Sequence, residues 1–359
     1  MRWYYIKFIP TANAPVPSNG GDFLLEYGTQ SANISFFGFG SANLPGALEV
    51  DFDIEVAPFD QMQPNSVLKI YNPPQAVIDS AQYYQGMQIE IYAGFAITNG
   101  AGFPLANSNN NGLLAKGTVV ISYANWVGGD MCLQLLFGSS LVSGAAVQEI
   151  EPGRSNAAKP IVFKWNKDIQ FKTALENALK PVGITEFVYS DIPEFNLKDQ
   201  QYLTVNYDIL SFSTKIREIT ADIQNKSYTL GVWILQKTPT QVQVVGGTKS
   251  AEATIEIYAD QIIGQPTVSY AGGDSTQSAT VQIQSVHPMR ADIKLGNWIQ
   301  LKQVSSIFQP GTPFIPSKSL AAKDKQLFVT KIRHLGKFRD SSYQGWVTVI
   351  TSSVDMTKN

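Results

Sequence analysis

Ser66-Val-Leu-Lys-Ile-Tyr-Asn-Pro-Pro74 is followed, after a short spacer, by Gly86-Met-Gln-Ile-Glu-Ile-Tyr-Ala-Gly-Phe95. Both halves predict strands. The first ends at two prolines, which cannot donate a backbone hydrogen bond, and the second alternates apolar with polar residues. The same order of strand, proline, glycine and strand recurs from Thr280 to Pro288 and from Gly296 to Lys302. The sequence therefore predicts two copies of one β pattern.

The likeness extends to both sides of each copy. Leu48 to Val56 precedes the first copy, and Ala253 to Gln261 precedes the second. Each copy then has a long turn-rich insertion and two closing strands; the insertions are Thr98 to Leu114 and Ser305 to Asp324, and the strands are Thr118 to Ala124, Met131 to Phe137, Gln326 to Ile332 and Gly345 to Thr351. Few residues are identical between the copies, so the repeat is one of pattern.

Length and composition indicate a globular chain with more than one core. The chain has 359 residues, of which 44% are hydrophobic and 16% charged, enough for two or three cores. The single cysteine, Cys132, lies in an apolar run, so we expect it to be buried and to form no internal disulfide.

Charge and hydropathy argue against two kinds of partner. Residues 1 to 150 hold four Lys and Arg against eleven Asp and Glu, the reverse of what a nucleic-acid reader carries. No apolar run approaches the roughly 20 residues of a membrane span, and no basic-then-apolar leader is present. We therefore expect synthesis in the cytoplasm and no membrane insertion.

The middle of the chain changes character. Glu149 to Asn156 predicts a linker, and a helix follows with Asp168 as its N-cap and an apolar stripe that includes Phe171 and Leu175. A second helix is expected after Ser211, with short strands around both helices. The predicted fold is mainly β, with two β domains (1–155 and 251–359) flanking a small α+β domain (156–250).

One predicted strand carries a row of carboxylates. From Leu48 to Val56 the apolar residues alternate with Glu49, Asp51, Asp53 and Glu55, which share a face. At spacings near ~7 Å these groups repel one another, so solvent is expected to screen them. The row is open to four interpretations: a calcium site, half of a glycosidase pair, a surface kept negative for a purpose, or an ordinary solvated face.

No other pattern predicts chemistry. The two histidines, His287 and His334, have no metal ligands at suitable spacing, and no nucleophile elbow or phosphate-binding loop is present. We therefore expect no catalytic residues, no metal and no cofactor.

The order of motifs resembles the baseplate hub proteins of contractile-tailed bacteriophages, the Mu-like tail hub family. Leu68 to Asn72 and Gly86 to Phe95 are similar to its "Ile-x-Ile-Tyr-Asn" and "Gly-x-x-Val-x-Leu-x-Ala-Gly-Tyr" strands. Ala115 to Val119 takes the position of the family's third strand. Ile262 to Pro266 is similar to its "Leu-Ile-Gly-x-Pro" segment, and Val286 to Leu301 is similar to its second strand pair.

The resemblance implies a structural virion protein of the tail baseplate. Each chain of a homotrimer would contribute two tail-tube-like β-barrel domains, so that six similar domains surround a channel. Such a hub joins the hexameric tail tube to the trimeric central spike, and its partners are the tube protein, the spike and other baseplate subunits. DNA passes through without specific binding.

The same resemblance assigns roles to particular residues. The carboxylates Glu49, Asp51, Asp53 and Glu55, with Glu252, Glu256 and Asp260 of the second copy, are expected to line the channel and repel phosphate. The insertions, with Asn107, Asn109, Phe308 and Phe314, are expected either to contact neighbouring subunits or to be mobile hairpin tips.

Two other functions are compatible with the sequence. A tail-associated cell-wall hydrolase would need a catalytic carboxylate or a Cys-His or Ser-His site. A carbohydrate-binding tail protein would use some of the six Trp and fifteen Tyr, together with the loop Asn107 to Asn111. Aromatic residues buried in the β cores would argue against the second.

Overall fold

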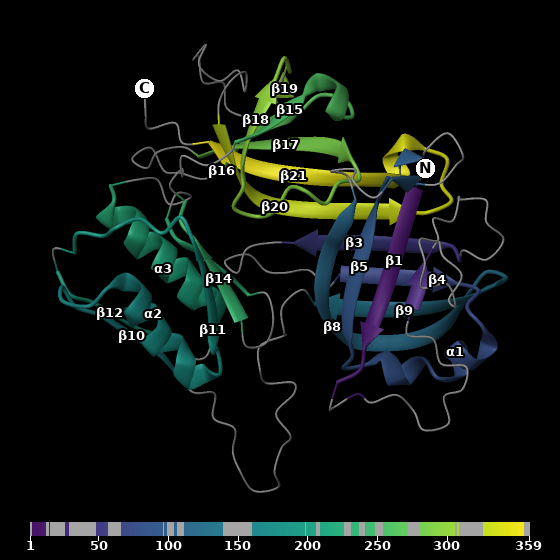
Figure 1. Ribbon diagram of the computed structural model, residues 1–359, viewed down its shortest axis with the longest axis horizontal. Helices are drawn as coiled ribbons and strands as arrows, with labels where there is room; N and C mark the ends of the chain where they lie inside the picture. The colour runs from purple at the N-terminus through teal and green to yellow at the C-terminus, as the bar shows by residue number, and fades with distance from the viewer. Residues whose placement is uncertain are drawn as a thin grey trace, which may run out of the picture.

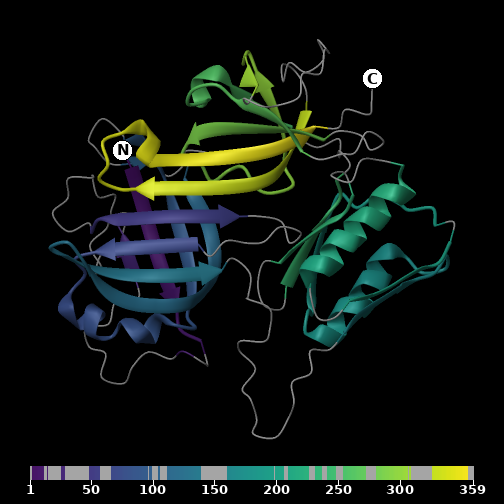
Figure 2. The same ribbon diagram turned by 180° about the vertical axis from the view of Figure 1, so that it is seen from behind.

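The computed structural model describes residues 2–11, 14, 26–28, 48–56, 66–95, 97–98, 104–105, 111–138, 160–197, 199–205, 209–225, 231–236, 241–247, 254–271, 280–305, 307–308 and 326–354. Within these ranges the chain is mainly β with an α+β insertion, which confirms the predicted fold class. Two β units lie against each other, and the α+β unit lies to one side of them (Figure 1, Figure 2).

We call the first β unit module 1. Its elements are β1 (Arg2–Ile9), β2 (Glu26–Gly28), β3 (Val50–Val56), β4 (Ser66–Tyr71), α1 (Gln75–Asp79), the 3₁₀ helix η1 (Ala81–Tyr84), β5 (Gln88–Phe95), β6 (Ile97–Thr98), β7 (Pro104–Leu105), β8 (Gly112–Val127) and β9 (Asp130–Gly138).

We call the second β unit module 2. Its elements are β15 (Ile255–Tyr258), the 3₁₀ helix η4 (Ala259–Gln261), β16 (Thr267–Ala271), β17 (Thr280–Pro288), β18 (Trp298–Lys302), β19 (Ile307–Phe308), β20 (Gln326–Lys337), the 3₁₀ helix η6 (Tyr343–Gly345) and β21 (Trp346–Val354).

The two modules share one strand order. Module 1 runs β3-β4-β9-β8-β5-β1, and module 2 runs β16-β17-β21-β20-β18-β15. The match extends to single residues. Gly86 N–H donates to Val119 O at 2.8 Å, and Gly296 N–H donates to Val329 O at 3.0 Å. Both glycines have a left-handed backbone, with φ of 84° and 82°, which favours glycine.

An irregularity of register also recurs. The β8–β9 pairing shifts between Val119 and Ile121, and the β20–β21 pairing shifts between Val329 and Lys331. Gly86 and Gly296 are separated by the same number of residues as the two register shifts. The strands β8 and β20 can therefore be aligned residue by residue. Strands with one bulge at one place are equivalent parts of two similar units.

The upstream strands of the two copies were matched wrongly from the sequence. Ala253 to Gln261 was expected to correspond to Leu48 to Val56, but the strand in the place of β3 is β16, which pairs with β17 as β3 pairs with β4. β15 occupies the place of β1, and it runs parallel to β18 where β1 is antiparallel to β5. Alternation alone does not say which neighbour a strand has.

The modules are joined through their sheets. β20 of module 2 pairs antiparallel with β3 of module 1, from Ile332 opposite Val56 to Lys337 opposite Asp51. The strands β16-β17-β21-β20-β3-β4-β9-β8 therefore form one continuous surface, which we call the long sheet. In Figure 1 its middle strands run across the view, and β1 and β5 cross module 1 in another direction.

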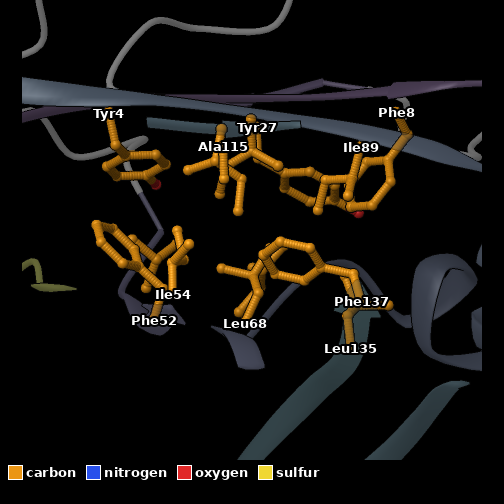
Figure 3. Close-up of a cluster of buried hydrophobic side chains, with 14 of the residues drawn as sticks. Tyr4, Phe8, Tyr27, Phe52, Ile54, Leu68, Ile89, Ala115, Leu135 and Phe137 are labelled. Carbon is orange, nitrogen blue, oxygen red and sulfur yellow. The ribbon is translucent and has the colours of Figure 1, made fainter. Parts of the chain in front are cut away.

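One face of the long sheet is covered by further strands of each module. In module 1, β1, β2 and β5 close over the covered face, and the two layers of side chains meet in Figure 3: Tyr4, Phe8 and Ile89 from one side, Phe52 and Leu68 from the other. β15 and β18 contribute Ile257 and Ile299 to the corresponding core of module 2. We call the face away from both cores the open face.

The α+β unit has its own core. Its elements are β10 (Ile161–Trp165), α2 (Phe171–Leu179), the 3₁₀ helix η2 (Lys180–Val182), β11 (Glu186–Ser190), β12 (Gln201–Val205), α3 (Ile209–Ile223), β13 (Trp233–Gln236) and β14 (Gln241–Val245). The expected N-cap was wrong: α2 begins after Gln170, not after Asp168. The boundaries near 155 and 250 fall outside the described residues and stay predictions.

Candidate functional site

The joint between the modules brings the acidic row onto a row of cations. Asp53 accepts two hydrogen bonds from Arg333, at 2.8 Å from Nε and 2.6 Å from Nη2. Glu55 forms an ion pair with Lys331, and Lys337 lies opposite Asp51 in the register. The expectation that these carboxylates repel one another with only solvent to screen them was therefore wrong, because β20 supplies their counterions.

The environment of each charge is uneven along the row. Burial raises the pKa of Asp51, although Tyr71 donates to its Oδ2 at 3.3 Å and Lys337 and Lys69 lie near. Burial, followed by the nearby Asp51 carboxylate, raises the pKa of Tyr71 to about 12. The hydrogen bonds from Arg333 to Asp53 raise the pKa of the guanidinium. The row thus carries paired charges rather than a bare negative stripe.

The covered side of the joint is aromatic. Trp346 of β21 is fully buried and packs on Phe52 of β3, with ring centroids 5.2 Å apart. Its indole N–H donates to Gly94 O at 3.0 Å, and Phe338 lies between Trp346 and Tyr4. Trp346 and Phe338 thus belong to the core of module 1, so the two modules share a core as well as a sheet.

The structure does not bring all the predicted acidic residues together. Glu49, Asp51, Asp53 and Glu55 lie in or just before β3, the last three on the open face. Glu256 lies in β15 on the far side of module 2 and bonds to Tyr258 and Lys302. Asp260 lies in η4. Glu252 is outside the described residues. The place of β3 in module 2 is taken by β16, whose side chains include Thr267 and Ser269.

The predicted contact residues lie mostly outside the description. Asn107, Asn109 and Phe314 are not among the described residues. Phe308 is in the two-residue strand β19, which pairs parallel with Thr267 and Val268 of β16. The start of the second insertion therefore lies at the edge of the long sheet.

Sequence reasoning missed the cations of β20. Lys331, Arg333 and Lys337 alternate in the printed sequence as the acids of β3 do, so the charge pattern was there to be matched. What the sequence could not show is that the two strands are neighbours, since Asp53 and Arg333 are 280 positions apart.

The two histidines are buried parts of module 2. His287 Nδ1–H donates to Gln261 O at 3.0 Å, since a carbonyl can only accept, and Ser285 Oγ lies 2.7 Å from Nε2. His334 Nδ1 lies 3.0 Å from Thr348 Oγ1. Burial lowers the pKa of His287 to about 4 and that of His334 to about 3. Both side chains are neutral at neutral pH.

Three observations bear on the other functions considered. Trp165, Trp233 and Trp346 are buried in cores, so they are not available to a glycan. Within the described ranges no group of three or more His, Cys, Asp or Glu is arranged to hold a metal ion. No helix in the described part of the chain is long and apolar enough to cross a membrane.

Comparison with known proteins finds similarity only among solved structures. No family model matches the sequence, and no curated protein matches it. One similar structure is the tail protein from Neisseria meningitidis MC58, at 12% identity over 86% of this chain and 96% of that chain, with a TM-score of 0.43. Another is the 43 kDa tail protein of prophage MuSo2 from Shewanella oneidensis, at 7% identity over 85% of this chain and 97% of that chain, with a TM-score of 0.45. A Francisella PdpA-VgrG complex is also similar, at 8% identity over 99% of this chain and 58% of that chain, with a TM-score of 0.43. These identities and TM-scores are too low to assign a role to this chain.

Proposed function

We propose that this chain is a structural hub of a phage-like tail, in which three copies form a ring that joins a sixfold tube to a threefold spike. Each chain contributes two similar β modules, so three chains present six similar units. The long sheet forms the wall of the ring, and its open face lines the channel.

A single observation carries this proposal: the modules have the same strand order and are joined side by side through β3 and β20. A side-by-side joint of this kind is heterologous, because it uses different edges of the two units. Heterologous contacts form closed rings when the rotation between units closes. The chain thus already contains one of the joints that a ring of modules needs.

The charges of the open face suit a channel through which DNA passes. The cations Lys331 and Arg333 are engaged by Glu55 and Asp53, so they are not free to bind phosphate. We propose that the β3 carboxylates keep the wall from holding DNA by neutralising these cations, as well as by repelling phosphate.

The mass of the protein in solution tests the ring. Sedimentation of the full chain over a range of concentrations is expected to show a monomer and a trimer. The reason is that two modules per chain close a six-unit ring only with three chains. A stable dimer that does not progress to a trimer would contradict the proposal.

Removing the carboxylates tests the role of the charges. The double variant Asp53→Asn and Glu55→Gln is expected to bind duplex DNA at low salt. The slope of log K against log salt is expected to be steeper by about 2, roughly one for each of Lys331 and Arg333, which lose their acidic partners. Fluorescence anisotropy with a labelled duplex measures it. The fold is expected to persist, because partly exposed ion pairs contribute about 1 kcal/mol or less.

The matched control changes the same charges elsewhere. Asp199→Asn with Glu186→Gln removes two carboxylates from the α+β unit, where both residues are exposed. This control is expected to leave DNA binding as weak as in the unaltered protein. Equal binding by both double variants would show that net charge, and not the joint, keeps DNA off.

A further inference from the structure

We infer that the second joint of the ring is made by β8 of one chain and β16 of the next, with Trp126 as its central apolar contact. This inference rests on the proposed ring. It assigns an interaction surface on each side and names the occupant, which is a second copy of this chain. The template is the joint that the chain already makes between β20 and β3.

The alignment of the modules fixes the residues. Because β8 corresponds to β20, the segment Ser122 to Val127 corresponds to Ile332 to Lys337, which pairs with β3. On the other side, Thr267 takes the place of Asp53. Across the sheet, Asp53 is in line with the first residue of β8 after its register shift, and Thr267 is in line with the first residue of β20 after its shift. The transferred register sets Tyr123 opposite Ser269, Ala124 opposite Val268 and Trp126 opposite Pro266.

β8 has the edge that this joint needs. Its first part pairs with β5 up to Thr118, as the first part of β20 pairs with β18. Beyond Val119, no strand in the described ranges pairs with the other edge of β8, whereas the same part of β20 is paired with β3. A long strand with an unpaired edge is a template for another chain.

Two side chains of this segment are exposed where their counterparts are buried, whereas Ser122 is buried and donates its hydroxyl to Ala81 O of η1. Trp126 is 68% exposed, and Ala124 beside it is also exposed. Their counterparts on β20, Gly336 and His334, are buried at the joint. A large aromatic on the core side of a strand edge, uncovered in one chain, indicates a partner that covers it.

The sizes of the side chains are complementary across the second joint. Inside the chain the large ring belongs to β3, because a Cβ on Gly336 would meet Phe52 ring atoms at 2.2 to 2.5 Å. At the second joint the large ring belongs to β8, as Trp126, and the facing position is Pro266, which other parts of the single chain already bury. At each joint one large ring thus faces a residue without a large side chain, with the roles of the two strands exchanged.

The charges distinguish the two joints. Lys331 and Arg333 correspond to Ile121 and Tyr123, which are 45% and 38% exposed, and Asp53 and Glu55 correspond to Thr267 and Ser269. Pairing β8 with β3 of another chain would put carboxylates beside apolar side chains without counterions, which is costly. The charged joint therefore stays within the chain and the neutral joint falls between chains.

β19 occupies part of the β16 edge in the single chain. It pairs through only two positions, Ile307 with Thr267 and Phe308 with Val268. The joint between β3 and β20 has six opposed positions, from Ile332 to Lys337. On assembly, β8 of the next chain would replace β19 at the edge of β16. In the free chain, β19 covers part of this edge and so limits non-specific pairing with other strands.

Disulfide trapping tests the joint directly. In a Cys132→Ala background, Tyr123→Cys with Ser269→Cys is expected to give covalent dimers and trimers on a non-reducing gel. The matched control is Arg333→Cys with Glu55→Cys, the equivalent pair of the internal joint, which is expected to cross-link within one chain. Each single variant is expected to give no covalent trimer on the same gel.

The outcomes separate this inference from the hub itself. Covalent trimers from the Tyr123 and Ser269 pair support the joint. If the unaltered protein sediments as a trimer but this pair gives no interchain disulfide, the joint is wrong and the ring stands. If no self-association and no interchain disulfide occur at any concentration, both the joint and the ring are wrong.

A second variant gives the strength of the contact. Trp126→Ala is expected to weaken self-association roughly 30-fold, as for an interface residue of the strongest class, with an unchanged melting temperature at low concentrations, where the chain is monomeric. Tyr202→Ala removes an aromatic that is 65% exposed on the α+β unit and is expected to change neither. Equal association of both variants and the unaltered protein would overturn the role of Trp126.

Discussion

Trp346→Ala is expected to lower the free energy of unfolding by about 4 kcal/mol, the cost typical of deleting a large buried aromatic. Trp346 is completely buried, packs between Phe52 and Phe338, and donates its indole N–H to Gly94 O. Its removal leaves a cavity at the place where the two modules share a core, and an acceptor without its donor. Chemical denaturation of the full chain measures the loss.

Substitution of an exposed tryptophan provides the control. Trp126→Ala removes the same side chain from β8, but Trp126 is 68% exposed in the single chain. The free energy of unfolding of the monomer is expected to change by less than about 0.5 kcal/mol. A loss below about 1 kcal/mol for Trp346→Ala would mean that the modules do not depend on a shared core.

Acidification is expected to destabilise module 2 before the carboxylates titrate. His287 and His334 have folded pKa values of about 4 and about 3, below the value near 6.5 of an unfolded histidine. A lowered folded pKa means that the stabilisation is complete above about pH 6.5 and is lost as pH falls toward the folded values. At pH 5 the loss is about 2 kcal/mol for each histidine.

Denaturation curves at pH 7 and pH 5 measure this loss. The double variant His287→Asn and His334→Gln removes both titrations and is expected to lose much less stability between these two pH values, whatever its stability at pH 7. The interval lies above the ordinary pKa of Asp and Glu, so the carboxylates contribute little. Identical pH dependence in the variant and the unaltered protein would show that the histidines are not the source.

The repeat was predictable from the sequence because it lies in local signals. Proline ends a strand and glycine takes a left-handed turn wherever they occur, so the order of strand, proline, glycine and strand gave β4, β5, β17 and β18 close to their observed bounds. The alternation of β3 likewise predicted the face on which Asp51, Asp53 and Glu55 lie.

What could not be predicted depends on contacts distant in the chain. The sequence showed the acids of β3 but not their neighbour, so the counterions on β20 were missed. The sequence predicts β15 as the counterpart of β3 because each precedes its copy in the chain, yet its parallel partner, β18, places β15 in another layer. The exposed Trp126 carried no signal of its own until the alignment with Gly336 showed that its counterpart is buried.

In the proposed assembly each chain supplies two equivalent units to one ring. A density map of the assembled protein at a resolution that separates strands would show this arrangement. We expect three chains and six modules at one level, with β3–β20 joints alternating with β16–β8 joints and the open face around the channel. A map in which the two modules of a chain stack along the axis, or in which the open face points outward, would contradict it.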